Sequence, residues 1–339
     1  MKAIFVTQEV DPSSPVLGGT VAKISALAAR VDGVCVLADR AVAGALPANC
    51  TVRLFRSSTR AGRGVRFEAA LARELTRDPR GTFVLAHMCP IYAVLAAPVA
   101  RPLGCRVLLW FTHWRSSRLL AAAERLASAV VTVDERTFPL ASHKVVPIGH
   151  GIDLAAFPCT DRPQRDPLRL LALGRTSPAK GLAVVAQGAA LVPGVHLDIV
   201  GPSLTVEERA HRAELERLIG ELGARDRITV SSAVPRDRVP ALLAGADALV
   251  NNMRAGATDK VVYEAAATCL PVLASNPAFE GFLPDGLRFE REQPESLAAR
   301  VRWLADADRS AVGRELRARV ERDHSVDGWA RRVVDVAGR

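Results

Sequence analysis

A short polar loop at residues 174–181, GRTSPAKG, carries two cationic side chains, Arg175 and Lys180. Arginine offers phosphate oxygens a planar fork, and lysine offers them a compact point charge. The loop follows a largely apolar run, 168–173, and precedes an apolar-periodic segment that extends to about residue 190. This order predicts strand, loop and helix, so that loop amides and a helix N-terminus would add donors for an anion. The loop is therefore predicted to bind phosphate, and the alternative is a solvated basic surface.

Lysine is scarce in this chain, which makes the loop lysine informative. Of 45 Lys and Arg residues, only five are lysines, at positions 2, 23, 144, 180 and 260. Because arginine is abundant everywhere, Arg175 alone says little about a binding site. We therefore favour phosphate contact by Lys180 over a solvated position.

The composition is typical of a globular protein with about two domains. The chain has 339 residues, of which 49% are hydrophobic and 24% charged. The net charge of +9 and a pI of about 9.8 favour anionic partners, such as nucleotide-linked substrates or anionic membrane headgroups. The arginines are spread over predicted helices and aromatic residues are few, which argues against binding of nucleic acid. Weak association with anionic membranes is compatible with this charge.

Cysteine usage and the apolar segments favour the cytoplasm. The six cysteines are scattered, without a CxxC pair or a Cys/His cluster of zinc-site spacing, and several lie in apolar runs as small hydrophobic residues. The first residues, MKAIFVTQEV, are predicted to enter a strand directly and do not resemble a signal peptide. The apolar stretch 83–100 contains His87, Pro90 and Pro98, and is predicted to form a buried strand and a helix. We therefore expect a cytoplasmic location, with peripheral attachment to a membrane left open.

Strands and helices alternate along the chain, which favours an α/β fold of two Rossmann-like, doubly wound domains facing across a cleft. The expected organisation is a first domain over 1–150, a linker over 151–167, a second domain over 168–325, and a terminal helix over 326–339 that can cross back to the first domain. Strands are expected at 2–7, 34–37, 51–55, 82–86, 106–111, 130–133, 144–148, 168–173, 195–200, 227–231, 248–250 and 271–274. The clearest helices are expected at 20–31, 66–77, 91–101, 116–128, 206–222, 235–244 and 259–269, with arginine-rich helices from 294 onward.

Several residues stand where a strand gives way to a helix, which is where open α/β sheets bind ligands. His113 follows the strand predicted at 106–111, and either a structural or a ligand-facing role is open to it. Gly18 and Gly19 precede the first helix, where the lack of side chains would let a ligand approach the backbone. Their spacing is not GxGxxG, so the ordinary dinucleotide fingerprint is absent.

In this order, the motifs resemble those of retaining glycosyltransferases of the GT-B fold, in the large family four. The matching stretches are Gly18–Gly19, FTH ending at His113, GHGID at 149–153, GRTSPAKG at 174–181, DIVG ending at Gly201, and DKVVYEAAATCLPVLASN at 259–276.

The resemblance implies a nucleotide diphosphate sugar as donor, with transfer that retains the anomeric configuration. It places the donor diphosphate on Arg175 and Lys180, and the transferred sugar beside His113. No cofactor and no metal are expected, because the two cations neutralise the leaving diphosphate. The acceptor is unknown, and a small molecule or a glycolipid is expected.

Further donor contacts are implied at the other motif positions. Glu264 would accept hydrogen bonds from the ribose hydroxyls, and the backbone amides of Lys260 and Val261 would meet the distal phosphate. Gly19 would let the first-domain loop close on the diphosphate and the acceptor. Two glycines of the phosphate motifs, Gly174 and Gly201, complete the expected donor site.

One position departs from the family pattern. A second acid usually stands eight residues before the glutamate on the helix, and here that position is Gly256. We expect Asp259 to recognise the sugar hydroxyls instead, although a plain helix-capping role is the alternative. The departure also leaves open an inactive nucleotide-sugar-binding protein. An epimerase or phosphorylase of the same fold is a third alternative, which no sequence feature favours. A DxD-like pair, Asp306 and Asp308, is predicted to lie on a solvated helix face.

Overall fold

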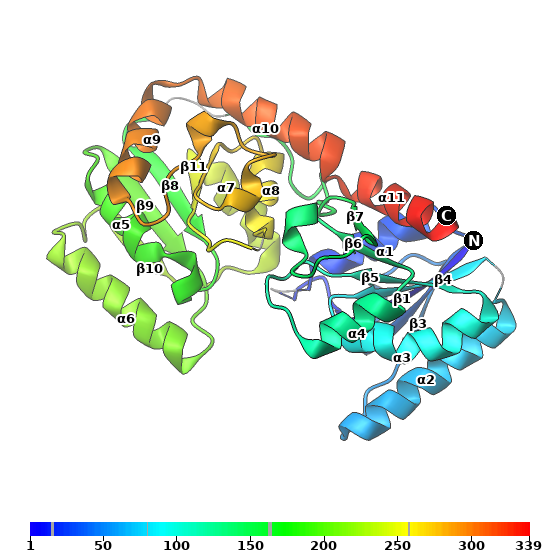
Figure 1. The fold of residues 1–339 in the computed structure, drawn as a ribbon. Coiled ribbons are helices and arrows are strands. Elements are labelled where there is room, and N and C mark those ends of the chain that lie inside the picture. Colours follow the sequence, from blue (N-terminus) through cyan, green and yellow to red (C-terminus); the bar gives the residue numbers. More distant parts are fainter. Residues whose placement is uncertain (15–16, 80, 162–164, 257) are drawn as a thin grey trace. The chain divides into compact units, whose positions relative to one another are not determined.

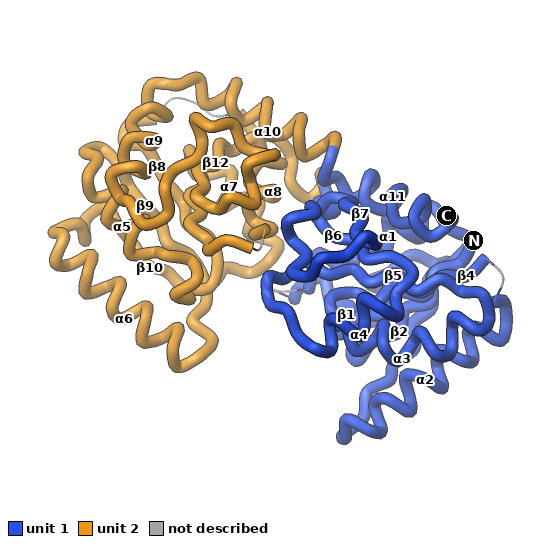
Figure 2. Tube along the Cα trace, in the orientation of Figure 1, with its two compact units in different colours: residues 1–153, 323–339 blue, residues 154–322 orange. Residues whose placement is uncertain are grey.

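Two sheets of parallel strands organise the chain. The computed structural model describes residues 1–14, 17–79, 81–161, 165–256 and 258–339. These residues form two α/β units, shown in different colours in Figure 2: unit 1 contains residues 1–153 and 323–339, and unit 2 contains residues 154–322. The expected linker is thus shared between the units, and its residues 162–164 lie outside the described residues.

Within the described part of unit 1, seven strands pair in the order β3-β2-β1-β4-β5-β6-β7 (Figure 1). The strands are β1 Lys2–Val10, β2 Gly33–Ala41, β3 Cys50–Leu54, β4 Thr82–His87, β5 Arg106–Trp110, β6 Ala129–Thr132 and β7 Val145–Pro147. The helices are α1 Gly19–Ala28, α2 Arg60–Arg77, α3 Pro90–Ala100, α4 Arg118–Leu126 and the C-terminal α11 Val326–Gly338. Short 3₁₀ turns are η1 Arg101–Leu103 and η2 Glu135–Thr137.

The sequence of the central strands explains their position. Every residue of β4 is buried, as are Ala3 through Thr7 of β1, so both faces of the sheet are covered, as parallel sheets require. By contrast, α2 buries only a stripe, Phe67, Leu71 and Leu75, at four-residue spacing, and exposes arginines on its other side. The helix therefore covers the sheet and leaves a basic surface.

The C-terminal helix α11 belongs to unit 1. Trp329 on α11 meets Trp110 of β5 edge to face, with ring centroids 5.6 Å apart. The ammonium of Lys23 on α1 lies over both rings, 4.5 Å and 5.5 Å from their centroids. Arg332 also donates to the carbonyl of Ile148, at 3.0 Å. These contacts fix the end of the chain on the same unit as its beginning.

In the described part of unit 2, five parallel strands pair in the order β10-β9-β8-β11-β12. The strands are β8 Leu168–Leu173, β9 Val195–Val200, β10 Ile228–Ser231, β11 Ala248–Asn251 and β12 Val272–Ala274. The helices are α5 Leu182–Ala190, α6 Val206–Glu221, α7 Val239–Gly245, α8 Lys260–Ala267, α9 Pro294–Asp306 and α10 Arg309–Asp323, whose last residue is assigned to unit 1. Short 3₁₀ turns are η3 Pro178–Lys180, η4 Arg236–Arg238, η5 Pro277–Phe279 and η6 Asp285–Leu287.

Two element boundaries differ clearly from the sequence prediction. Strand β1 continues to Val10, where a loop was expected from residue 8, because Glu9 and Val10 pair with β2 and Val10 is fully buried. Helix α2 begins at Arg60, six residues earlier than expected. The hydroxyl of Thr59 accepts a hydrogen bond from the amide of Gly62 and so caps the N-terminus of the helix. Glycines in the first turns, which disfavour helix, made this start hard to predict.

The sequence predicted free cysteines throughout, but two of the six form a disulfide. Cys159 and Cys269 form a disulfide across 110 residues of sequence, within unit 2. Their spacing gave no sign of it, because the pairing depends on where the end of α8 lies relative to the segment before β8. No helix in the described residues is long and apolar enough to cross a membrane, and the stretch 83–100 forms β4 and α3.

Helix α10 supports the end of α8 through a glycine. A Cβ atom at Gly313 would overlap the backbone carbonyl of Cys269, which follows α8. Since the clash is with backbone rather than with a flexible side chain, the two segments would have to separate. This close approach therefore positions the helix that carries Glu264.

We expect Gly313→Ala to lower the free energy of unfolding by about 1–3 kcal/mol, the usual cost of overpacking. The matched control is Gly245→Ala on α7, where a Cβ would meet no atom within 4 Å. Chemical denaturation should separate the two variants. Equal stability of Gly313→Ala and the wild-type protein would show that α10 does not hold α8 in place.

Candidate functional site

The predicted phosphate loop lies at the carboxyl edge of the unit 2 sheet. Strands β8 and β11 are neighbours in this sheet. After β8 the chain continues to β9 on one side, and after β11 it continues to β12 on the other. Such a reversal is where open α/β sheets bind ligands. The loop after β8 supplies Lys180, and the segment after β11 supplies Asp259 and the start of α8.

Glycines allow the segments at this edge to approach closely. Gly174 has φ +138°, and a Cβ there would lie 2.6 Å from Nζ of Lys180. A Cβ at Gly201, which follows β9, would overlap the carbonyl of Gly174. Both positions therefore require glycine for packing, whether or not a ligand binds. The Lys180 side chain lies directly over the backbone at Gly174.

Lys180 and Asp259 form the central contact of the site. The ammonium of Lys180 binds Oδ2 of Asp259, and the same oxygen accepts a hydrogen bond from the side-chain amide of Asn251 at 2.8 Å. The two charged side chains are only 14% and 20% exposed, so water screens them little. The contact joins the loop after β8 to the N-terminus of α8, across 79 residues.

Asp259 occupies the N-cap position of α8 but does not act as a capping side chain. In the described structure its carboxylate accepts no bond from the first turn of the helix. The helix-capping alternative is therefore wrong, and the carboxylate is directed to Lys180. Recognition of sugar hydroxyls by Asp259 stays a prediction.

Two asparagines that the sequence analysis missed hold this edge together. Asn252 donates to the carbonyl of Gly181 at 2.9 Å and accepts from the hydroxyl of Ser275 at 2.6 Å. Asn251 ties Asp259 to the end of β11. The available signal was a pair of amides directly after an apolar strand, at the edge where ligands bind.

Glu264 lies on α8 in a charged cluster. Its side chain is 3% exposed and receives a two-pronged hydrogen bond from Arg236 of η4, including Nη1 to Oε2 at 2.9 Å. Nζ of Lys260 lies 2.9 Å from Oε1. Burial opposes ionisation of Glu264, but Lys260 and Arg236 outweigh it and lower its pKa. Arg236 was not foreseen, because nothing in its local sequence distinguishes it from other arginines.

Arg175 is turned away from the Lys180–Asp259 contact. Its guanidinium lies 3.4 Å from Glu208, which caps α6 on the β9 side of the loop, and its side chain is 56% exposed. The structure thus brings Lys180, Asp259, Lys260, Val261 and Glu264 to the start of α8, with Arg175 directed elsewhere.

The backbone explains the departure at Gly256. This residue has φ +93°, a conformation that glycine favours and other residues rarely adopt. A side chain at this position would strain the loop before α8 in its present conformation.

The predicted residues of unit 1 lie at the carboxyl edge of its sheet. Gly19 is the first residue of α1, and Gly18 is its N-cap. A Cβ at Gly18 would come within 2.7 Å of the backbone oxygens of Pro12 and Ser14, so the loop after β1 requires glycine there.

His113 follows β5 in a half-buried aromatic setting. Its ring stacks on Trp114, with centroids 5.5 Å apart, and Nδ1 accepts a hydrogen bond from the amide of Arg115 at 3.0 Å. This bond leaves Nε2 to carry the proton of the neutral ring. Burial, and secondarily the charge of Arg115, lowers the pKa of His113 below 6.5. The ring is therefore a neutral donor at neutral pH.

The two DxD-like acids lie where α9 ends and α10 begins. Asp308 accepts a hydrogen bond from the amide of Ala311 at 2.9 Å, at the start of α10, and Asp306 is the last residue of α9. Within the described ranges, no group of three or more His, Cys, Asp or Glu side chains is placed to hold a metal ion.

The second unit is similar to a known protein family. Residues 161–322 match the family model for glycosyl transferases group 1. This match spans most of unit 2 and slightly less than half of the chain. The chain is also 31% identical over 208 residues to D-inositol 3-phosphate glycosyltransferase of Mycolicibacterium gilvum, a match that covers 55% of this chain and 46% of that protein. The chain thus matches somewhat less than half the length of this curated relative.

Solved structures match both units together. Sucrose-phosphate synthase from Thermosynechococcus elongatus aligns with a TM-score of 0.76 at 17% identity, over 99% of this chain and 98% of that one. Anabaena HepE in complex with UDP aligns with a TM-score of 0.79 at 18% identity, over the whole of both chains. These likenesses show the GT-B fold, as the sequence motifs predicted.

We expect Glu264→Gln in unit 2 to lower the free energy of unfolding by roughly 3 kcal/mol at pH 7, because Arg236 and Lys260 lose their charged partner. A carboxyl group whose pKa falls on folding stabilises the protein above its ordinary pKa of 4.5, and this stability is lost as the pH falls through the folded pKa. The difference from the wild-type protein should therefore shrink below about pH 4.5. Denaturation from pH 7 to 3 measures it, with exposed Glu216→Gln as control. A pH-independent difference would contradict the prediction.

For His113 we expect an NMR titration midpoint below 6.5, because burial and Arg115 disfavour the charged ring. Arg115→Gln should raise the midpoint without restoring it fully, since burial is the larger cause. A reaction step that needs neutral His113 should retain most of its rate at pH 6.5. The rate should then fall as the pH is lowered further. A midpoint at or above 6.5 would show that the ring is solvated and charged more readily than its surroundings indicate.

Proposed function

We propose that the protein transfers a sugar from a nucleotide diphosphate donor to an acceptor hydroxyl. The observation that carries this proposal is the contact of Lys180 with Asp259 beside the N-terminus of α8, at the point where the sheet order reverses. The match to glycosyl transferases group 1 supports it. So does the fold shared with Anabaena HepE, whose structures were solved with UDP and with UDP-glucose.

The donor would bind along the start of α8. Lys180 and the first-turn amides of Lys260 and Val261 offer positive charge and donors to the diphosphate. A carboxylate has about four acceptor directions, and in the described structure Arg236 and Lys260 use three of those of Glu264. The remaining direction suits one ribose hydroxyl. Arg236 thus orients the carboxylate and limits how the ribose can approach it.

The chemistry we infer needs no protein nucleophile. The bond between the anomeric carbon and the diphosphate oxygen breaks, and the acceptor oxygen forms its bond on the same face of the sugar. The acceptor proton passes to the departing diphosphate oxygen, so the anomeric configuration is retained. Lys180 and the dipole of α8 stabilise the charge on the leaving group, which makes positioning and electrostatics the main sources of rate.

Unit 1 would bind the acceptor, a small molecule or a glycolipid. The neutral His113 ring can donate from Nε2 to a hydroxyl of the transferred sugar or to the acceptor. Neither metal nor cofactor is part of the proposal, because Lys180, Lys260 and the helix terminus supply the positive charge. The basic surface of the chain would also favour weak contact with anionic membranes.

A second candidate function is binding of a nucleotide sugar without transfer. It is favoured by Gly256, which has a positive φ and no side chain at a position where an acid is usual in the family that this chain resembles. A panel of acceptors separates the two functions. A protein that binds nucleotide sugars but neither hydrolyses nor transfers them would be a binder.

For the transferase, we expect Lys180→Ala to reduce turnover by about a hundredfold or more, since it removes charge that stabilises the leaving group. Transfer from UDP-sugars and other nucleotide sugars should be measured in excess EDTA, with donor consumption followed by chromatography. Full loss of activity in EDTA that manganese restores would contradict a metal-free reaction.

The matched control is Lys2→Ala, which removes the same charge from the opposite, amino end of the unit 1 sheet. Lys2 is 52% exposed and should leave turnover unchanged. Wild-type turnover in a folded Lys180→Ala variant would remove Lys180 from the mechanism.

A further inference from the structure

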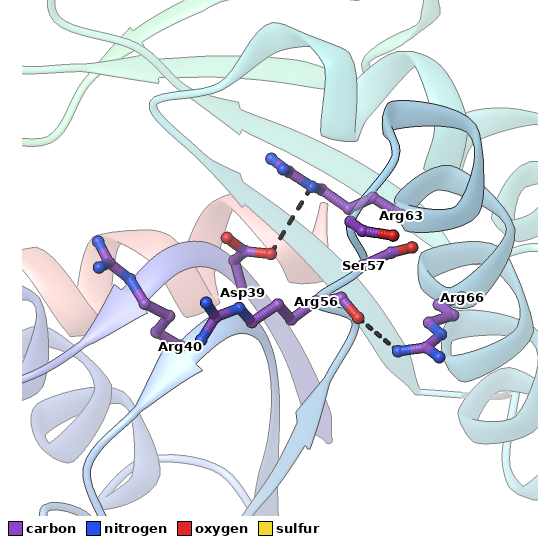
Figure 3. Close-up of a pocket in the computed structure, with 7 residues that line it drawn as sticks. Asp39, Arg40, Arg56, Ser57, Arg63 and Arg66 are labelled. Atoms are coloured by element: carbon purple, nitrogen blue, oxygen red, sulfur yellow. Dashed lines mark hydrogen bonds and ion pairs between the residues drawn. The ribbon is translucent and has the colours of Figure 1, made fainter.

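Unit 1 contains a basic cavity that the proposed donor site does not use. Its volume is about 510 Å³, and it lies where β2 and β3 end and α2 begins (Figure 3). In the described part of the chain, four of its lining residues are arginines, and they come from three separate segments. These are Arg40 at the end of β2, Arg56 after β3, and Arg63 and Arg66 in the first turns of α2.

The charges in this cavity are unbalanced. Among its described lining residues the one carboxylate is Asp39, which faces Arg63 with Oδ1 and Nε 3.7 Å apart. Figure 3 marks the pair of Arg63 with Asp39. Arg40 pairs with Glu9 of β1, with Nη2 and Oε1 3.3 Å apart. Arg66 instead donates to the backbone carbonyl of Arg56 at 2.5 Å, which fixes the turn between β3 and α2. Asp39 and Glu9 together balance only part of the charge of the four arginines, so the cavity keeps an excess of positive charge.

The N-terminus of α2 adds to this field. Thr59 caps the helix, which is 18 residues long, and its positive pole faces the same loop as the arginines. The hydroxyl of Ser57 also lines the cavity. Planar guanidinium forks, a hydroxyl donor and a helix N-terminus together match the tetrahedral oxygens of a phosphate group.

We propose that this cavity binds the phosphoryl group of the acceptor. Assigning the phosphate to an acceptor depends on the proposed function, whereas phosphate binding itself does not. Strand β2 is the neighbour of β1, whose following loop holds Gly18 and Gly19, and adjacent strands lie about 4.8 Å apart. A phosphate over β2 and β3 would thus place the rest of a small acceptor above β1 and β4, where the order of the sheet reverses.

An arginine-rich surface without a ligand is the competing explanation, because the chain contains 45 Lys and Arg residues. That explanation predicts that exposed arginines of α2 are interchangeable. The proposal predicts that only those in the cavity matter. Arg73 lies on the same helix, is exposed and does not line the cavity, so it provides the matched control.

The test is calorimetric titration of the full chain with glucose 6-phosphate, glucose and inorganic phosphate at low ionic strength. We expect both phosphate-containing probes to bind and glucose not to bind. Arg56→Gln should weaken binding about tenfold or more, and Arg73→Gln should leave it unchanged. Asp39→Asn should tighten binding of inorganic phosphate about two- to fivefold, because it removes the competing carboxylate. A variant that merely damages the fold would not tighten binding.

Two results would overturn the proposal. One is equal affinity of Arg56→Gln and the wild-type protein for both phosphate-containing probes. The other is binding that Lys180→Ala abolishes and Arg56→Gln does not affect, which would assign the phosphate to unit 2. Thermal unfolding of each variant confirms that it is folded.

A second arm identifies the source of the phosphate. Vesicles of phosphatidylcholine with phosphatidylinositol are compared with vesicles of phosphatidylcholine alone. Vesicle binding that needs phosphatidylinositol and Arg56 would support the phosphoryl site and assign it to a lipid acceptor. Vesicle binding that is insensitive to Arg56, without binding of glucose 6-phosphate, would overturn it.

The two proposals fail separately. If glucose 6-phosphate binds through Arg56 but no nucleotide sugar is consumed with any acceptor, the phosphate site stands and the transfer reaction is wrong. If transfer occurs equally well to acceptors without phosphate and is unaffected by Arg56→Gln, the transfer reaction stands and the phosphate site is wrong.

Discussion

The ion pair between Lys180 and Asp259 is the interaction on which the geometry of the unit 2 edge depends. It joins the loop after β8 to the first residue before α8, and Asn251 connects the same carboxylate to β11. The pair can form only because Gly174 has no side chain where the lysine crosses the backbone. The absence of a side chain at Gly174 thus determines where the ammonium of Lys180 lies. The positive end of α8 is held in place by this contact rather than by a capping side chain.

The same pair sets the energetics of ligand binding. A poorly solvated ammonium without a counter-ion is costly, so Asp259 stabilises the ligand-free state. A diphosphate that binds Lys180 must therefore compete with Asp259, and its net binding free energy is the difference between the two partners. Glu264 differs, because Arg236 and Lys260 hold it from two sides and leave it little freedom to move. We infer that this part of the site is preformed for the ribose, whereas the lysine exchanges partners.

The sequence predicted the strands beside the candidate site better than the contacts within it. The segments Leu168–Leu173 and Val195–Val200 form strands over the predicted residues, with mostly buried apolar residues and a few exposed polar ones. The carboxyl edge of the sheet then follows from topology. The partner of Asp259, the turn of Arg175 toward Glu208 and the disulfide of Cys159 could not be predicted. Each depends on which of several polar groups, distant in sequence, comes nearest in three dimensions.

Because arginine is abundant throughout the chain, basic binding sites cannot be recognised from the sequence. The structure shows which arginines and lysines lie close together. In both units, cations at the carboxyl edge of the sheet face an acidic residue, Asp259 in unit 2 and Asp39 in unit 1. The unit 2 pair is mostly buried, so its electrostatic interaction is strong and little affected by salt. In unit 1, Arg63 is 44% exposed and lies 3.7 Å from Asp39, so salt weakens this contact readily. An anion displaces such a screened carboxylate at small cost. The unit 1 cavity is thus suited to a ligand that binds and leaves quickly, as an acceptor must when each turnover replaces it with product.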